Sequence, residues 1–143
     1  QVAGIVLVDP AGLVKATLKP GLIATSTAWF VRPSDARSAR LIERMQAPGH
    51  AAPPELAEWF TLVGRHTRSN GAPGPVGDDV LARWRDTRRT VVTGEQDPFF
   101  PPEKLTPVAR RALATDPVVV PDTGHLLTHE HPQAVIDAVL ALA

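Results

Sequence analysis

Two residues that could do chemistry together each follow a predicted strand. Asp97 lies in VVTGEQDPFFPPE, three residues after Gly94 ends a β-rich run. His125 lies in VVVPDTGHLLTHEHP, on a glycine-containing loop after the next apolar run. Side chains after neighbouring parallel strands meet at the carboxyl edge of the sheet, so we expect these two to meet there. The carboxylate would accept the imidazole N–H, fix the tautomer and stabilise the imidazolium formed when His125 takes a proton.

Short apolar runs predict the strands that would position this pair. Residues 2–8, 89–93 and 117–120 are rich in Val and end at turns, which is typical of strands covered on both faces of a parallel sheet. Helical patterns follow the second and third runs, at residues 101–114 and 131–143. This order predicts an α/β fold with three parallel strands and flanking helices.

The two predicted helices carry more specific expectations. Pro107 should lie in the first turn of its helix or break it, because proline has no N–H to donate. The last helix should dock on the sheet through one apolar stripe, formed by Val135, Ile136, Val139, Leu140 and Ala143.

A long insertion separates the first two strands. It contains helical patterns at residues 34–46 (with Ser34 as N-cap), 53–66 and 78–86, and a Gly/Pro-rich loop at 68–77. We therefore divide the chain into a first core strand (1–12), an inserted helical segment (13–88), and core strands and helices that carry the acid and histidine (89–143).

At this point the chain resembles the α/β-hydrolase family. The family's acid motif, G-x-x-D-x-x-x-P, is matched by Gly94, Asp97 and Pro101. Its histidine motif, G-H-x-x-x-x-E-x-P, is matched by Gly124, His125, Glu130 and Pro132. Residues 2–12 are similar to the strand that follows the family's nucleophile helix. The resemblance implies that residues 13–88 are a cap, Asp97 the triad acid and His125 the general base.

The nucleophile of that family has no counterpart in this sequence. The family places it earlier in the chain than the acid, on a G-x-S-x-G elbow. No such elbow surrounds Ser26, Ser34, Ser38 or Ser69, and G-x-D-x-G is absent too. Three strands alone would also leave the first with an unpaired edge. We expect an N-terminal segment or a separate chain to carry the nucleophile, and these 143 residues alone to be inactive.

The resemblance implies a hydrolase that cleaves an ester, thioester or related bond without a metal or organic cofactor. A serine outside this chain would attack the carbonyl, and His125 would take its proton. Epoxide hydrolysis, dehalogenation, C–C hydrolysis and acyl transfer are alternatives on the same scaffold. A non-catalytic ligand-binding protein of this fold is an alternative from another class.

Two further acids and two further histidines compete for roles. Asp97 could be only a turn former before Pro98, and Asp9, at the end of the first strand, is a rival for the triad acid. His129 and His131 beside His125 could suggest a metal site, but the sequence has no Cys and no carboxylate spacing that completes one. We expect these two histidines to be polar positions near the last helix, and Glu130 to be a structural hydrogen-bond acceptor.

Aromatic residues predict a small, apolar or aromatic substrate. The candidates for contact with it are Phe99 and Phe100 after the acid, and Trp29 and Trp59 in the cap, although core packing explains them as well. Phe30 and Phe60 are expected in the cap core first. The basic cluster Arg65, His66 and Arg68 is expected to be solvated surface, with a clamp for a substrate anion as the alternative.

Charge and composition exclude other classes of partner. Fifteen basic and fifteen acidic residues give a formal net charge of +0, so nucleic acid and anionic membrane surfaces are poor candidates. The absence of Cys excludes disulfides and a thiol nucleophile. No apolar run or signal peptide indicates a membrane or export, so a cytoplasmic location is the default expectation.

Overall fold

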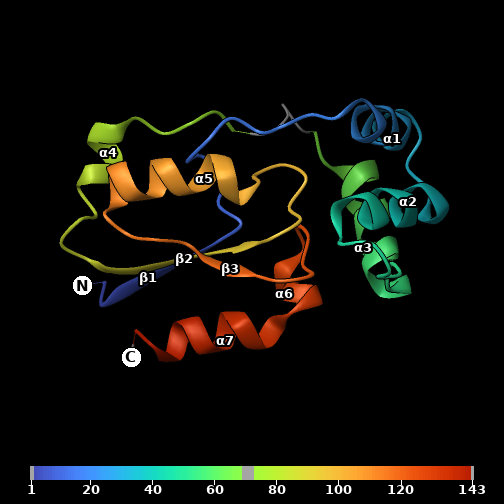
Figure 1. The fold of residues 1–143 in the computed structure, drawn as a ribbon. Helices are drawn as coiled ribbons and strands as arrows, with labels where there is room; N and C mark the ends of the chain where they lie inside the picture. The colour runs from blue at the N-terminus through green and yellow to red at the C-terminus, as the bar shows by residue number, and fades with distance from the viewer. Residues whose placement is uncertain (1, 69–72, 143) are drawn as a thin grey trace.

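The chain folds around a three-stranded parallel sheet with helices on both faces (Figure 1). The computed structural model describes residues 2–68 and 73–142. The strands are β1 (Gly4–Val8), β2 (Arg88–Gly94) and β3 (Val118–Val120). They lie in the order β1-β2-β3, and β2 pairs in parallel with both neighbours. The predicted fold class is therefore confirmed.

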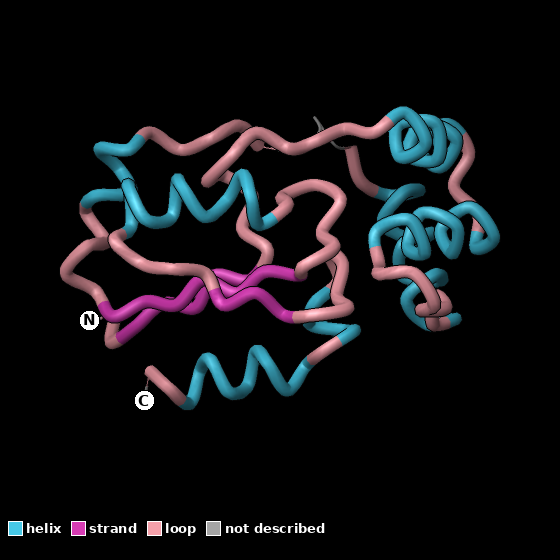
Figure 2. The backbone as a smooth tube through the Cα atoms, in the orientation of Figure 1, coloured by secondary structure: helices cyan, strands magenta, loops and turns pink. Residues whose placement is uncertain are grey.

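Helices cover the two faces of the sheet and form a separate lobe beside it. They are α1 (Pro20–Val31), α2 (Asp35–Met45), α3 (Pro54–His66), α4 (Asp78–Ala82), α5 (Pro102–Val108), the π-helix η1 (Ala109–Leu113), α6 (Leu127–Glu130) and α7 (Pro132–Leu140). Figure 2 shows α5 and α7 on opposite faces of the sheet and α1, α2 and α3 grouped at one end of the molecule. None of the described helices is long and apolar enough to cross a membrane.

The central strand is the best buried, because its side chains alternate between two cores. Val91 belongs to the cluster beneath α5 and η1, with Leu105 and Leu113, while Val92 belongs to the cluster beneath α7, with Leu127. The edge strands are less covered: β1 is partly exposed along its length, and Val118 and Val119 of β3 are exposed. The prediction of strands covered on both faces thus holds for β2 alone.

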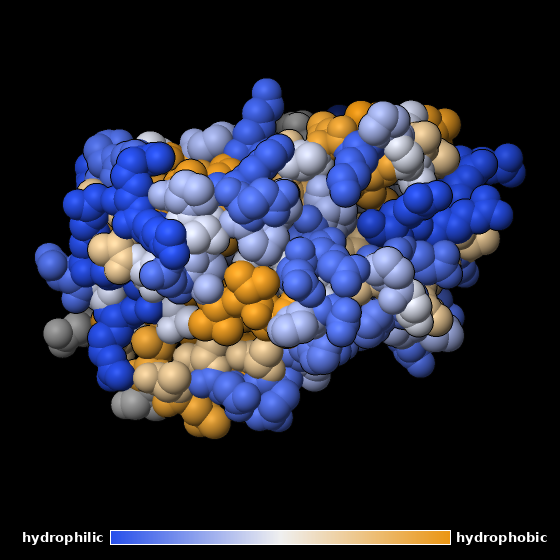
Figure 3. Space-filling model, in the orientation of Figure 1, coloured by the Kyte–Doolittle hydropathy of each residue, from blue (hydrophilic) through white to orange (hydrophobic). Residues whose placement is uncertain are grey.

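The predicted apolar stripe of α7 is wrong in its orientation. The helix packs on the sheet through the small residues Ala134 and Ala138 together with Val135, which let its backbone come close. Three residues of the predicted stripe, Ile136, Val139 and Leu140, are exposed, and Ala143 lies outside the described residues. Figure 3 shows apolar residues gathered on the surface over β3 and α7.

Pro107 neither lies in the first turn of its helix nor ends it. It is inside α5, and the chain then continues directly as the π-helix η1. Because proline removes one backbone hydrogen bond and crowds the preceding turn, a wider helical turn after it is a physically reasonable adjustment.

The helical lobe is smaller than the predicted cap. Its core contains Leu22, Trp29 and Leu41 from α1 and α2, whereas Leu13 and Leu81, inside the predicted cap range, pack in the sheet core. Helix α1 was not predicted. It begins at a proline, but its apolar residues lie on all sides and give no amphipathic period. The three helices predicted in the insertion are present as α2, α3 and α4. Ser34 is at the N-cap of α2 without a side-chain capping bond.

Gly94 should be intolerant of substitution, because the end of β2 lies against the histidine loop, residues 121–126 between β3 and α6. A Cβ atom there would collide with the carbonyl oxygens of Thr123 and Gly124. We expect Gly94→Ala to lower the free energy of unfolding by about 3 kcal/mol, since both obstacles are backbone atoms. Urea unfolding measures the loss. Gly74→Ala is the control, because a Cβ at Gly74 would meet nothing within 4 Å; equal midpoints for the two variants would contradict the prediction.

Candidate active site

Asp97 is held by the turn that follows β2. Its side chain is buried, and its Oδ1 accepts hydrogen bonds from the backbone N–H groups of Phe99 (2.7 Å) and Phe100 (3.0 Å). This is the local pattern by which Asp shapes a turn through its own backbone. The same pattern fixes the carboxylate and leaves Oδ2 for another partner. The turn role and an acid role for Asp97 are therefore compatible.

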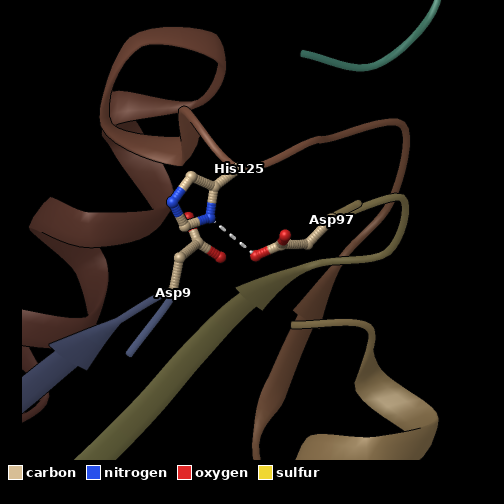
Figure 4. Close-up of side chains that lie close together, drawn as sticks. All are labelled: Asp9, Asp97 and His125. Atoms are coloured by element: carbon tan, nitrogen blue, oxygen red, sulfur yellow. Dashed lines mark hydrogen bonds and ion pairs between the residues drawn. The ribbon is translucent and has the colours of Figure 1, made fainter. Parts of the chain in front are cut away.

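His125 supplies that partner from the loop between β3 and α6. Its Nδ1 lies 2.9 Å from Asp97 Oδ2, as Figure 4 shows. The Asp97 side chain is 0% exposed and the His125 side chain 21% exposed. In the tautomer that donates Nδ1–H to the carboxylate, Nε2 has a free lone pair. The second ring nitrogen lies on the side of the ring away from Asp97 (Figure 4), where it could take a proton.

Two aromatic rings pack against the histidine. The ring centroids of Phe99 and Phe100 lie 4.8 Å and 5.5 Å from that of His125. Phe100 is buried in the sheet core, whereas Phe99 is partly buried and packs against both the sheet core and the core of the helical lobe. These contacts restrict the ring to the orientation that the Asp97 hydrogen bond requires.

Asp9 is a second buried carboxyl group in the site. It follows β1, and its Oδ1 accepts the Gly94 N–H at 3.0 Å, while its buried Oδ2 has no partner among the described residues. Burial raises the pKa of Asp9 to about 7; the Gly94 hydrogen bond opposes this shift, and the charge of Asp97 adds to it. The geometry thus joins His125 to Asp97 and joins Asp9 to the end of β2.

These three side chains also form a possible metal set. Ligand atoms of Asp9, Asp97 and His125 lie within 4.8 Å of one another. The Asp97 and His125 atoms that face each other are already joined by a hydrogen bond, so in this structure Asp97 orients the imidazole ring of His125. His129 and His131 are exposed and do not belong to this set.

The remaining candidate residues lie in the helical lobe or on its surface. Trp29 is buried in the lobe core, where its Nε1 donates to Ser38 Oγ at 3.0 Å. Trp59 on α3 is 57% exposed. The predicted basic cluster, Arg65, His66 and Arg68, is exposed as well.

Sequence reasoning missed a contact between the lobe and the histidine loop. The backbone N–H of His125 donates to the carbonyl oxygen of Met45, the last residue of α2, at 2.7 Å. Glu130 is the hydrogen-bond acceptor that the sequence predicts, but its partners could not be read from the sequence. The one signal was the glycine before His125, since a close approach of two backbones favours a residue without Cβ.

The sheet and this site together have the arrangement of an α/β-hydrolase fold, in which an acid and a histidine follow successive strands. The family profile described as "Alpha/beta hydrolase family" matches residues 1–138. The chain therefore belongs to the alpha/beta hydrolase family. None of the curated proteins matches the chain.

Solved structures with the same fold include three hydrolases. The chain is similar to carboxylesterase CesB (YbfK) from Bacillus subtilis (TM-score 0.66, 17% identity, covering 96% of this chain and 50% of that one). It is also similar to 2-hydroxy-6-oxo-6-phenylhexa-2,4-dienoate hydrolase (BphD) from Rhodococcus sp. strain RHA1 (0.63, 17%, 97% and 54%). For a meta-cleavage product hydrolase (CumD) from Pseudomonas fluorescens IP01, the TM-score is 0.69 and the identity 16%, and the match covers 97% of this chain and 54% of that one. The chain spans about half the length of these structures.

Proposed function

We propose that this chain supplies the acid and the general base of a serine hydrolase that cleaves an ester, thioester or related bond. The observation that carries the proposal is the buried Asp97 carboxylate held against Nδ1 of His125 at 2.9 Å. A segment outside residues 1–143 would supply the serine. Family membership supports a hydrolase, and the Asp97–His125 geometry supports this mechanism.

The proposed reaction uses each ring nitrogen once. His125 Nε2 takes the proton from the serine hydroxyl as its oxygen attacks the carbonyl, and later gives it to the leaving group. Asp97 keeps the proton on Nδ1 and stabilises the imidazolium between the two steps. The hydrogen bonds that Phe99 and Phe100 donate hold Asp97 Oδ1 in place, so that Oδ2 stays directed at Nδ1 of His125.

We further propose that the segment with the serine adds to the free edge of β1. Among the described strands, β1 pairs with β2 alone, so one edge of it can accept another strand. A groove of about 330 Å³, lined by Gly4, Val6, Val139 and Leu142, lies beside it. Three of these four residues have apolar side chains, which could pack against a segment that extends the sheet.

The proposed substrate is small and apolar or aromatic. Phe99 supports this proposal most directly, because it is partly buried and touches the His125 ring. Trp29 supports it less, since it packs in the lobe core. Trp59 could contact a substrate only from the exposed surface of α3.

A fluorophosphonate probe tests the proposed mechanism. We expect the complete protein to be labelled at one serine, because an activated serine attacks such probes. The His125→Ala variant should lose this labelling by about 10³-fold or more in rate, whereas His129→Ala, at an exposed position nearby, should keep it. Labelling without ester turnover would favour C–C hydrolysis or acyl transfer on the same scaffold. An unlabelled wild-type protein that binds a ligand tightly would contradict the proposal and favour a binding protein.

A further inference from the structure

The end of α2 and the histidine loop touch through their backbones. The His125 N–H donates to the Met45 carbonyl oxygen at 2.7 Å. A Cβ built at Gly124 would lie 2.5 Å from the carbonyl carbon of Gln46 and 2.6 Å from the Ala47 nitrogen. Such distances leave no room for a side chain at position 124. The segment that leaves α2 therefore rests directly on the residue that precedes the proposed base.

One carboxylate binds both of these segments. Glu130 Oε1 accepts the N–H of Ala47, after α2, at 2.8 Å and the N–H of Gly124 at 3.0 Å. Its Oε2 accepts the N–H of Leu126 at 3.2 Å. Hydrogen bonds to a charged acceptor are about twice as strong as neutral ones. Glu130 thus holds the backbone on both sides of His125 and, with the same group, the backbone at the end of α2.

We propose that Glu130 is a positioning residue that locks the helical lobe to the histidine loop, so that the lobe and His125 move together. Helix α2 packs against α1 and α3 in the lobe, and its last residue, Met45, is bonded to His125. A displacement of the lobe would therefore pull on the His125 backbone. The inference rests on the proposed function only in taking His125 as the base; the hydrogen bonds that carry it do not depend on that role.

Loss of the lock should be visible in backbone amide exchange, without any measurement of activity. We expect Glu130→Gln in the complete protein to speed exchange of the Ala47, Gly124 and Leu126 amides together, by about tenfold or more. The neutral amide oxygen accepts weaker hydrogen bonds than a carboxylate, and its NH₂ group faces at least one of the three N–H donors. Exchange of the Val91 amide in the sheet should be unchanged. Glu43→Gln is the matched control, because Glu43 is an exposed residue of α2.

Two exchange results would overturn the inference. If the Ala47 amide keeps its protection in Glu130→Gln while Gly124 and Leu126 lose theirs, Glu130 only braces the histidine loop. If none of the three amides changes, Glu130 holds neither segment. Faster exchange at Val91 as well would indicate that Glu130→Gln destabilises the whole protein. The milder variant Ala47→Gly, which leaves every hydrogen-bond acceptor in place, is then measured instead. If Ala47→Gly leaves the exchange of the Gly124 and Leu126 amides unchanged, the coupling between the two segments is overturned.

The kinetic arm separates the lock from a loss of folded protein. Active sites are first counted by titration with the fluorophosphonate probe, so that kcat refers to intact sites. We expect kcat per titrated site to fall about 10-fold to 100-fold in Glu130→Gln, because small displacements of a catalytic group are costly, with a smaller change in KM. An unchanged kcat per site would overturn the positioning role. If the wild-type protein is not labelled at all, the proposed function fails, and the exchange arm still tests the lock.

Discussion

Replacing Asp97 with Asn in the complete protein should lower kcat by about 10³-fold to 10⁴-fold. The Asn oxygen can still accept the N–H bonds of Phe99 and Phe100, which Asp97 Oδ1 accepts now, so the turn should survive. The side-chain NH₂ would then face Nδ1 of His125 as a donor. The imidazole would have to move its proton to Nε2, and in that tautomer it could not take a proton from the nucleophile.

A matched substitution and the rival acid sharpen this prediction. Asp122→Asn changes an exposed aspartate on the turn after β3, and kcat should stay within about twofold, since substitutions of exposed side chains usually have small effects. Steady-state kinetics of both variants, with active sites titrated, measure the contrast. If Asp97→Asn keeps most of its activity while Asp9→Asn loses it, Asp9 is the acid and the assignment made from the Asp97–His125 hydrogen bond is wrong.

The sequence was sufficient for the parts of the fold that depend on short-range patterns. Continuous Val-rich runs predicted the three strands, and the rule that parallel strands share a carboxyl edge brought Asp97 and His125 together. The same rule places Asp9, at the end of the neighbouring strand, in the same group. Its position was therefore predictable, but its burial was not, because burial depends on what packs above the strand end.

The features that the sequence did not predict depend on how elements pack. Helix α1 has apolar residues on all sides, so its sequence lacks the amphipathic period that would predict a helix. The lobe buries Leu22 and Trp29 and leaves Ile23 and Phe30 exposed. In α7, large apolar residues suggested one face, but the small Ala134 and Ala138 form the contact. The bond from His125 to Met45 joins residues 80 positions apart, and no local pattern encodes such a pairing.

The second large effect concerns the stability of the protein through Asp9. In the unfolded chain this carboxyl group should have its ordinary pKa of 3.8, whereas in the folded protein burial raises the pKa to about 7. Between these values the folded state binds more protons than the unfolded state. The contribution of Asp9 to the free energy of unfolding should therefore be greatest below pH 3.8, fall as pH rises, and be fully lost above pH 7.

Asp9→Asn should remove this loss. The Asn oxygen can keep the Gly94 hydrogen bond that Oδ1 accepts, and the side chain cannot ionise. Relative to the wild type, we expect the free energy of unfolding of the variant to be higher by about 3 to 4 kcal/mol at pH 8 and by less than about 1 kcal/mol near pH 4. Urea unfolding of both proteins at the two pH values measures the difference.

The pH dependence of this difference is the decisive quantity, because any local packing effect of the substitution should be similar at both pH values. Asp86→Asn, at an exposed position before β2, should show no such dependence. A constant difference for Asp9→Asn from pH 4 to pH 8 would mean that Asp9 is ionised with an ordinary pKa despite its burial. If the expected dependence is found, the protein retains, beside its proposed base, a carboxyl group that destabilises the fold at neutral pH, and such groups occur preferentially at functional sites.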